Sequence, residues 1–117
     1  YLTFWVREAG GGASTTISEP VSNISAGQWY QLVGTCQGGS GGYMKVYSNG
    51  TFRNSKSITF NVETGVGITQ NMRLGNAFNN ANSKFDGKVA IARFYDKVLT
   101  DEEIKQNFDA LRGRFEL

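Results

Sequence analysis

The stretch FDGKVAIARFYD, residues 85–96, followed at once by KVLTDEEI, residues 97–104, decides how this sequence folds. In an extended chain, successive side chains point to opposite sides. Both sides are apolar here apart from Arg93: one carries Val89, Ile91 and Tyr95, and the other carries Ala90, Ala92 and Phe94. Because a strand that is apolar on both faces is covered on both faces, we expect residues 89–95 to lie in the middle of a sheet.

A short helix is predicted to begin directly after this strand. Thr100 and Glu103 have the spacing of a capping box, and Leu99 and Ile104 have that of a hydrophobic staple. The acidic residues of the first turn favour the same start, because the helix dipole is positive there. Gly113 is a typical stop, so the helix has about three turns. Its apolar stripe comprises Ile104, Phe108 and Leu111.

The chain before residue 85 predicts a series of short strands joined by tight turns. Strands are expected within residues 1–7, 13–25, 28–37, 43–48, 51–62 and 68–76. Asn49-Gly50 is the signature of a type I′ hairpin, in which both central residues need a positive φ. Gly38–Gly42 predicts a flexible hairpin loop. The fold class is therefore all-β: an antiparallel β-sandwich (jelly roll) with one short C-terminal α-helix.

The order of these segments resembles the concanavalin A-like lectin/glucanase superfamily, and in particular its laminin G-like jelly-roll domains. The landmarks are Phe4-Trp5-Val6, then residues 28–35, 45–50 and 73–76, and finally residues 85–104. The tail, residues 107–115, resembles the endings of such domains in tailed-phage structural proteins. In this family the counterpart of Phe4-Trp5-Val6 is normally preceded by further strands. The resemblance therefore implies that residues 1–117 are a single domain that lacks its N-terminal strands.

Composition excludes several classes of function. The 117 residues contain no His and a single Cys, and their net charge is +2. The absence of His excludes Ser-His-Asp and Cys-His catalysis and histidine-based metal sites. The small net charge and the lack of a long apolar run argue against nucleic acid and against a membrane as partners. Cys36 lies in a predicted strand and is expected to be an inert core thiol.

Glycoside hydrolysis is the enzymatic alternative that the resemblance raises. That reaction needs two carboxyl groups flanking a substrate groove. The glucanases of the superfamily carry them as Glu-x-Asp-x-x-Glu on one strand, and no such run occurs here. The acidic cluster Asp101-Glu102-Glu103 is explained by the helix cap and dipole. We therefore expect the domain not to be an enzyme.

An Asn-rich loop is the predicted ligand site, for a glycan. The Asn side chains can donate to and accept from sugar hydroxyls, and an aromatic ring can stack on a pyranose face. The alternative is a solvated turn in which Phe78 fills the core. The candidate residues are Asn76, Phe78, Asn79, Asn80, Asn82 and Lys84.

Other positions carry alternatives of their own. No cofactor or metal site is predicted, although Asp86 with neighbouring Asn carbonyls offers oxygen ligands for calcium. Trp5 and Trp29 suit either a sugar platform or the core, and the core is favoured. A charge in a central strand must be paired, reach water by snorkelling or face a groove, and for Arg93 we expect a structural partner such as Asp96 or Glu63.

The prediction for function is a non-catalytic domain that binds glycan or decorates a surface within a larger virion or extracellular structural protein. Its expected partners are a cell-surface or polysaccharide glycan and other structural subunits, and its expected location is a virion surface or the extracellular space. One alternative is a purely structural interaction module without a sugar ligand. Another is the accessory carbohydrate-binding domain of a secreted hydrolase.

Overall fold

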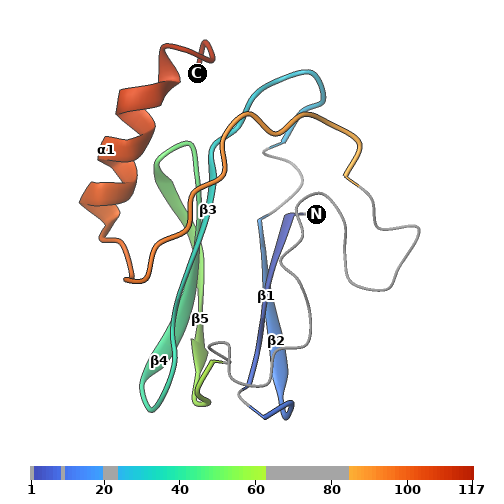
Figure 1. Cartoon of the computed structure of the whole chain (residues 1–117), viewed down its shortest axis with the longest axis vertical. Helices are drawn as coiled ribbons and strands as arrows, with labels where there is room; N and C mark the ends of the chain where they lie inside the picture. The colour runs from blue at the N-terminus through green and yellow to red at the C-terminus, as the bar shows by residue number, and fades with distance from the viewer. Residues whose placement is uncertain (1, 9, 20–23, 63–84) are drawn as a thin grey trace.

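A computed structural model describes residues 2–8, 10–19, 24–62 and 85–117 of the chain. The elements are β1 (Leu2–Arg7), β2 (Ser14–Glu19), β3 (Leu32–Gln37), β4 (Gly42–Ser48), β5 (Thr51–Ile58) and α1 (Asp101–Arg112). Within the described residues, β1 and β2 form one antiparallel sheet, and β3, β4 and β5 form another in that order (Figure 1). The predicted fold class is confirmed: two antiparallel sheets and one short C-terminal helix, consistent with a β-sandwich. The strand predicted within residues 68–76 lies outside the described residues.

The core lies between the two sheets. Strand β2 contacts both β4 and β5. The sheets approach closely at Gly34 of β3, where a Cβ atom would lie 2.8 Å from the ring of Phe4 on β1. Cys36 is half-buried against this core, and burial raises the pKa of its thiol, as expected for an inert cysteine. The buried core residues are Val6, Ile17, Met44, Val46 and Ile58.

Strand β4 is the strand covered on both faces. Its consecutive residues Val46, Tyr47 and Ser48 are all buried. Since consecutive side chains of a strand point to opposite faces, β4 must be covered on both sides. Val46 belongs to the core between the sheets, whereas Tyr47 packs with Leu99 and Ile104 beneath the helix. Strand β4 is therefore buried on both faces, a position that the sequence analysis did not assign to it.

The prediction of a buried strand over residues 89–95 is wrong. These residues form no strand, and Val89 and Phe94 are 56% and 65% exposed. Alternating side chains show only that a segment suits a sheet, whereas a strand exists only when its backbone pairs with a neighbour. Among the described residues no backbone hydrogen bond reaches this segment, and β3 pairs with β4 alone. The physical reason for the error is that none of the described residues pairs with this segment.

The β4–β5 hairpin is confirmed as predicted. Asn49 and Gly50 have φ values of 49° and 70°, the left-handed values of a type I′ turn. Hydrogen bonds join this turn to Gln31, in the segment before β3. The Gln31 backbone N–H donates to Asn49 Oδ1, and the Gln31 backbone carbonyl accepts from the Asn49 backbone N–H, both at 2.9 Å. Strand β3 begins at Leu32, four residues later than predicted. The glycine-rich loop joins β3 and β4 as expected.

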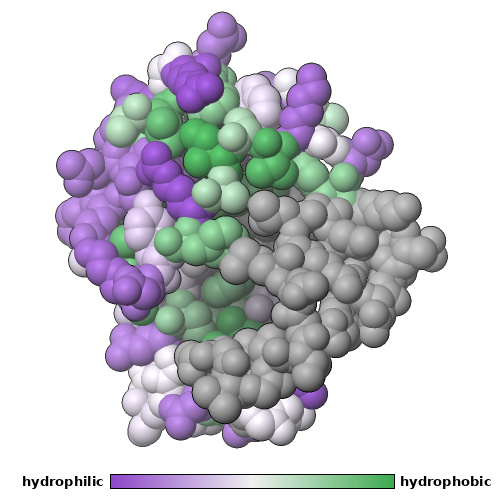
Figure 2. All heavy atoms as spheres, in the orientation of Figure 1, coloured by the Kyte–Doolittle hydropathy of each residue, from purple (hydrophilic) through white to green (hydrophobic). Residues whose placement is uncertain are grey.

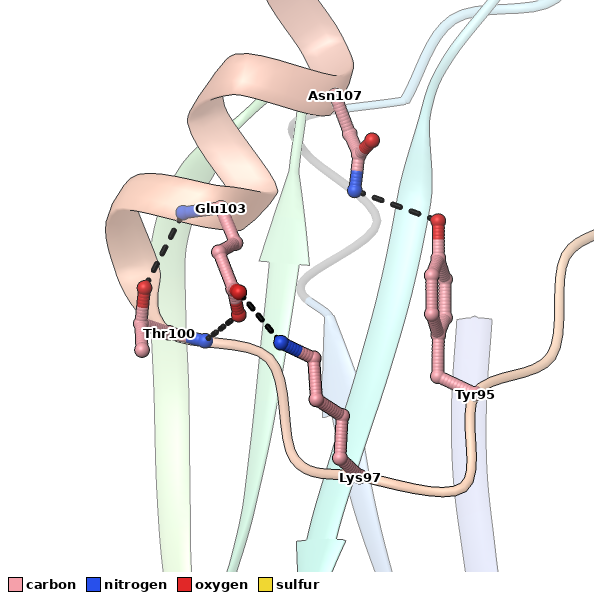
Figure 3. A network of polar contacts seen from close by, with 5 residues as sticks. All are labelled: Tyr95, Lys97, Thr100, Glu103 and Asn107. Carbon is pink, nitrogen blue, oxygen red and sulfur yellow. Dashed lines mark hydrogen bonds and ion pairs between the residues drawn. The ribbon is translucent and has the colours of Figure 1, made fainter.

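Helix α1 follows its predicted signals closely. The Thr100 hydroxyl accepts from the Glu103 amide and the Glu103 carboxylate accepts from the Thr100 amide, which completes the capping box (Figure 3). Leu99 and Ile104 lie in one cluster, as the staple predicts. Gly113 caps the C-terminus, with a right-handed φ of −63°. The helix is thus fixed at its start and docked on the β3–β4–β5 sheet through Ile104.

Candidate functional site

The six residues predicted to bind glycan lie outside the described part of the chain. They are Asn76, Phe78, Asn79, Asn80, Asn82 and Lys84, so their role stays a prediction. Asp86, the proposed source of calcium ligands, is described and exposed. In the described ranges no group of three or more His, Cys, Asp or Glu is placed to hold a metal ion.

A polar groove lies where the β3–β4 face meets the start of helix α1. It has a volume of about 520 Å³. The strand side contributes two tyrosine rings, an amide and an ammonium group, and the helix side contributes a hydroxyl and two carboxylates. The groove is lined by Gln37, Tyr43, Lys45, Tyr47, Val98, Leu99, Thr100, Asp101 and Glu102. Such a mixture suits a ligand that carries many hydroxyl groups.

Strand alternation and the capping box together build this groove. Tyr43, Lys45 and Tyr47 are two residues apart on β4 and therefore share its helix-facing side. The capping box sets the position at which the chain turns into the helix, and so places Asp101 opposite these side chains. Asp101 serves the helix dipole, as predicted, and also faces the sheet.

Electrostatic contacts hold the groove together. Tyr47 donates its hydroxyl to Asp101 Oδ1 at 2.7 Å, and Lys45 Nζ lies 3.7 Å from the same oxygen. Lys45 Nζ also lies 5.3 Å from the centre of the Tyr43 ring, a cation–π distance. Burial, and then the hydrogen bond to the Asp101 carboxylate, raise the pKa of Tyr47 above its usual range. The Tyr47 hydroxyl is thus a neutral donor that ties sheet to helix.

The sequence predicted Asp101 only as a helix cap, and it did not predict Tyr43 or Lys45 as site residues. The alternation of residues 43–47 was visible, and it places two Tyr and one Lys on a single face. That signal alone does not show what stands opposite the face. The groove arises from a contact between elements more than fifty residues apart, which the sequence pattern does not specify.

The preference for core positions at Trp5 and Trp29 is wrong. Trp5 is 53% exposed on β1, opposite Thr16 of β2, because its neighbours on either side face the core. Trp29 is 37% exposed, and its ring lies 5.3 Å from that of Phe115 beyond the helix. Trp5 is therefore available as an aromatic platform.

Arg93 has a different partner from either of those predicted. It donates to Asn107 Oδ1 of the helix at 3.3 Å. Figure 3 shows the second contact of Asn107, whose side-chain amide donates to the Tyr95 hydroxyl at 3.3 Å. Asp96 has no hydrogen-bond or ion-pair partner among the described residues, and Glu63 lies outside them. A carboxylate is not needed because Arg93 is exposed to water rather than buried in a sheet.

Replacing Tyr47 with phenylalanine tests the tie between sheet and helix. At neutral pH, Tyr47→Phe is expected to lower the free energy of unfolding by about 1 to 2 kcal/mol, because Asp101 loses a donor. The pKa of Tyr47 is higher in the folded protein than in the unfolded chain, where it is about 10. Its contribution to the free energy of unfolding is therefore complete below about pH 10, and it is lost as the pH rises from there through the folded-state pKa. The measurement is urea denaturation of both proteins between neutral and strongly alkaline pH. If the difference in free energy of unfolding between wild type and Tyr47→Phe does not decrease at alkaline pH, the result contradicts the account.

Two antiparallel sheets with a polar surface groove define the chain as a β-sandwich domain. More particularly, it belongs to the Laminin_G_3 family, described as the concanavalin A-like lectin/glucanases superfamily, whose profile matches residues 1–105. No curated protein matches the chain. In the described residues, no helix is both long enough and apolar enough to span a membrane.

A solved structure shares this fold. It comprises residues 221–444 of an S-layer domain-containing protein from Clostridium thermocellum ATCC 27405. The two chains are 22% identical and superpose with a TM-score of 0.61. The match covers 84% of this chain and 46% of the other, so the chain spans less than half of that structure.

Proposed function

We propose that this domain is a non-catalytic glycan-binding module that works at a surface or in the extracellular space. The observation that carries the proposal is the groove between β4 and the start of α1, where Tyr43 and Lys45 face Asp101. Sugar rings present hydroxyl groups around their edges and apolar C–H groups on their faces. A site with donors and acceptors beside an aromatic ring matches both features.

Binding rather than hydrolysis fits the carboxylates of the groove. A glycosidase needs an acid and a second carboxylate on opposite sides of the scissile bond. The groove's carboxylates, Asp101 and Glu102, are consecutive residues of one helix end. Asp101 already accepts from Tyr47 and lies beside Lys45. These contacts stabilise the junction of sheet and helix, and among the described residues that line the groove none on the strand side is a carboxylate.

The surface setting rests on the family and on the fold neighbour. The description of the family names both lectins and glucanases, and the structure with the same fold comes from an S-layer domain-containing protein. A cell-surface or polysaccharide glycan and neighbouring structural subunits are the partners that suit such a setting. Decoration of a virion surface, suggested by the tail sequence, is one form of this proposal.

A set of matched variants tests the proposal and locates the site. Tyr43→Ala is expected to weaken binding of a glycan identified on an array by about tenfold or more, since a lost aromatic contact costs about 1.4 kcal/mol. Trp5→Ala removes the exposed ring of β1, and Asn79→Ala/Asn80→Ala alters the Asn-rich loop. Isothermal titration compares these variants with wild type.

Each outcome of this comparison assigns a site. If glycan affinity falls only in Tyr43→Ala, the result supports the groove as the glycan-binding site. Loss confined to Trp5→Ala or to Asn79→Ala/Asn80→Ala moves the glycan site to the β1–β2 face or to the loop, and so overturns the groove. If wild type binds no glycan at concentrations up to about 1 mM, the purely structural module is favoured.

A further inference from the structure

A second groove adjoins the groove of the proposed site at the acidic start of helix α1. It has a volume of about 370 Å³ and lies between the β4–β5 turn and the helix. It is lined by Gly50, Thr51, Phe52, Asp101, Glu102 and Lys105. Because Asp101 and Glu102 line both grooves, the two grooves share one wall. We call the first the β4 groove and the second the turn groove.

A pair of aromatic rings connects the two grooves. Tyr47 lines the β4 groove and Phe52 lines the turn groove. The two residues are direct cross-strand partners, and their ring centres lie 5.8 Å apart in an edge-to-face arrangement. Since direct cross-strand partners project from the same face of a sheet, both grooves open on the face that carries helix α1.

The two grooves offer the same kinds of chemical group. Each contains an aromatic ring, a hydroxyl and an ammonium group, and the carboxylates of Asp101 and Glu102 serve both. A site that repeats its chemistry suits a ligand that is built from repeating units. The repeated groups belong to Tyr43, Thr100 and Lys45 in the β4 groove and to Phe52, Thr51 and Lys105 in the turn groove.

Each groove is large enough for a sugar unit of its own. Binding sites for small molecules have volumes of about 300 to 1,000 Å³, and the volumes of both grooves lie within this range. The Phe52 side chain is 45% exposed, although it is large and apolar. Its ring is therefore available to stack on the C–H groups of a sugar face.

The charges around the two grooves favour an uncharged glycan. Lys45 Nζ lies 3.7 Å from Asp101 Oδ1, and Lys105 Nζ lies 2.6 Å from Asp109 Oδ2. Both ammonium groups thus already lie beside a carboxylate, and Glu102 adds a further negative charge. Figure 2 shows that hydrophilic residues dominate the left edge of the molecule, where helix α1 lies. A carboxylated or sulfated sugar would meet more negative than positive charge here, which is unfavourable.

We propose that this domain binds a stretch of a neutral polysaccharide at least two sugar units long, with one unit in each groove. This inference rests on the proposed function, because one of the units occupies the β4 groove. The next unit lies against Phe52 in the turn groove. Once the first unit is bound, binding of the second is intramolecular, so a chain binds more tightly than a single sugar.

A series of oligosaccharides of increasing length tests the proposal. The probes are gluco-, manno-, xylo- and N-acetylglucosamine oligosaccharides of one to six units, with oligogalacturonates of the same lengths as the acidic comparison. In isothermal titration, the dissociation constant of the neutral series that binds is expected to fall about tenfold or more between one unit and about four units, and then to level off. Oligogalacturonates are expected to bind more weakly at every length.

Variants of Phe52 test the turn groove itself. Phe52→Ala removes the ring and is expected to abolish the gain in affinity with length, whereas Phe52→Tyr keeps a ring and is expected to retain the gain. Phe52→Leu keeps apolar contact with Tyr47 but lacks the ring, so it is expected to behave as Phe52→Ala does. Trp5→Ala is the control, because this exposed ring lines neither groove. Circular dichroism verifies the fold of each variant.

Amide NMR separates failure of this inference from failure of the proposed function. The longest bound oligosaccharide is expected to shift residues 50–52 as well as residues 43–47. Shifts confined to residues 43–47 and 100–102, or a gain with length that Phe52→Ala and Phe52→Leu retain, overturn this inference and leave the proposed function standing. Tighter binding of oligogalacturonates, or no binding of any neutral series up to about 1 mM, also overturns this inference. If no glycan on the array binds, the proposed function fails too.

Discussion

Replacing Ile104 with alanine is expected to lower the free energy of unfolding by about 2 to 5 kcal/mol, the usual cost of deleting a large aliphatic side chain from a core. Ile104 is fully buried, at 0% exposure. It packs with Tyr47 of β4 and Leu99 before the helix, so its removal leaves a cavity between helix and sheet. Because a domain has a total stability of about 5 to 15 kcal/mol, this one change removes a large share.

Lys105→Ala is the matched control for Ile104→Ala. It truncates the next residue of the same helix, which is exposed, and is expected to change stability by less than about 0.5 kcal/mol. Urea denaturation monitored by tryptophan fluorescence measures both variants. Equal, small effects in the two variants would show that helix α1 does not share the core of the domain.

Replacing Gly50 with alanine is expected to cost about 2 to 3 kcal/mol, from left-handed strain of about 1 to 2 kcal/mol and a steric clash. Gly50 has a φ of 70° in the β4–β5 turn. A Cβ atom there would lie 2.9 Å from Cδ1 and 3.0 Å from Cβ of Phe108 on the helix. The turn and the helix must therefore move apart to admit a methyl group.

Gly41→Ala separates strain from clash. Gly41 lies in the other hairpin loop with a φ of 73°, but no atom lies within 4 Å of its Cβ position. Gly41→Ala is therefore expected to show the strain alone. In the pair Gly50→Ala/Phe108→Ala the ring is removed but the Cβ of residue 108 stays, so the clash is relieved in part, and the two single losses of stability are expected to sum to more than the loss in the double variant. Additive losses in urea denaturation would contradict the contact between turn and helix.

Local signals were sufficient for much of the fold. The helix start at Thr100 and the turn at Asn49-Gly50 depend on hydrogen bonds and φ values within a few residues, and both are confirmed. The alternation of residues 43–48 also marked a strand, which in the structure begins one residue earlier. These features need no distant partner, which is why the residues themselves specify them.

Features that need a distant partner were not predictable in the same way. Residues 89–95 carry the side-chain pattern of a central strand, yet no other residue that the structure describes pairs with their backbone. The exposure of Trp5 depends on which face of β1 meets the other sheet. The groove forms only because the capping box brings Asp101 beside β4. The side-chain pattern indicates which secondary structure a segment can adopt, whereas tertiary contacts determine which segments pair and which side chains are buried.

The most direct test of the proposed function is backbone amide NMR mapping of a saturable glycan on the 1–117 protein. The glycan comes from an array screened with calcium and again with a chelator. The account predicts that the largest shift changes cluster at residues 43–47 and 100–102, around the groove. Saturable binding that leaves these residues unchanged, or no saturable glycan in either condition, contradicts it.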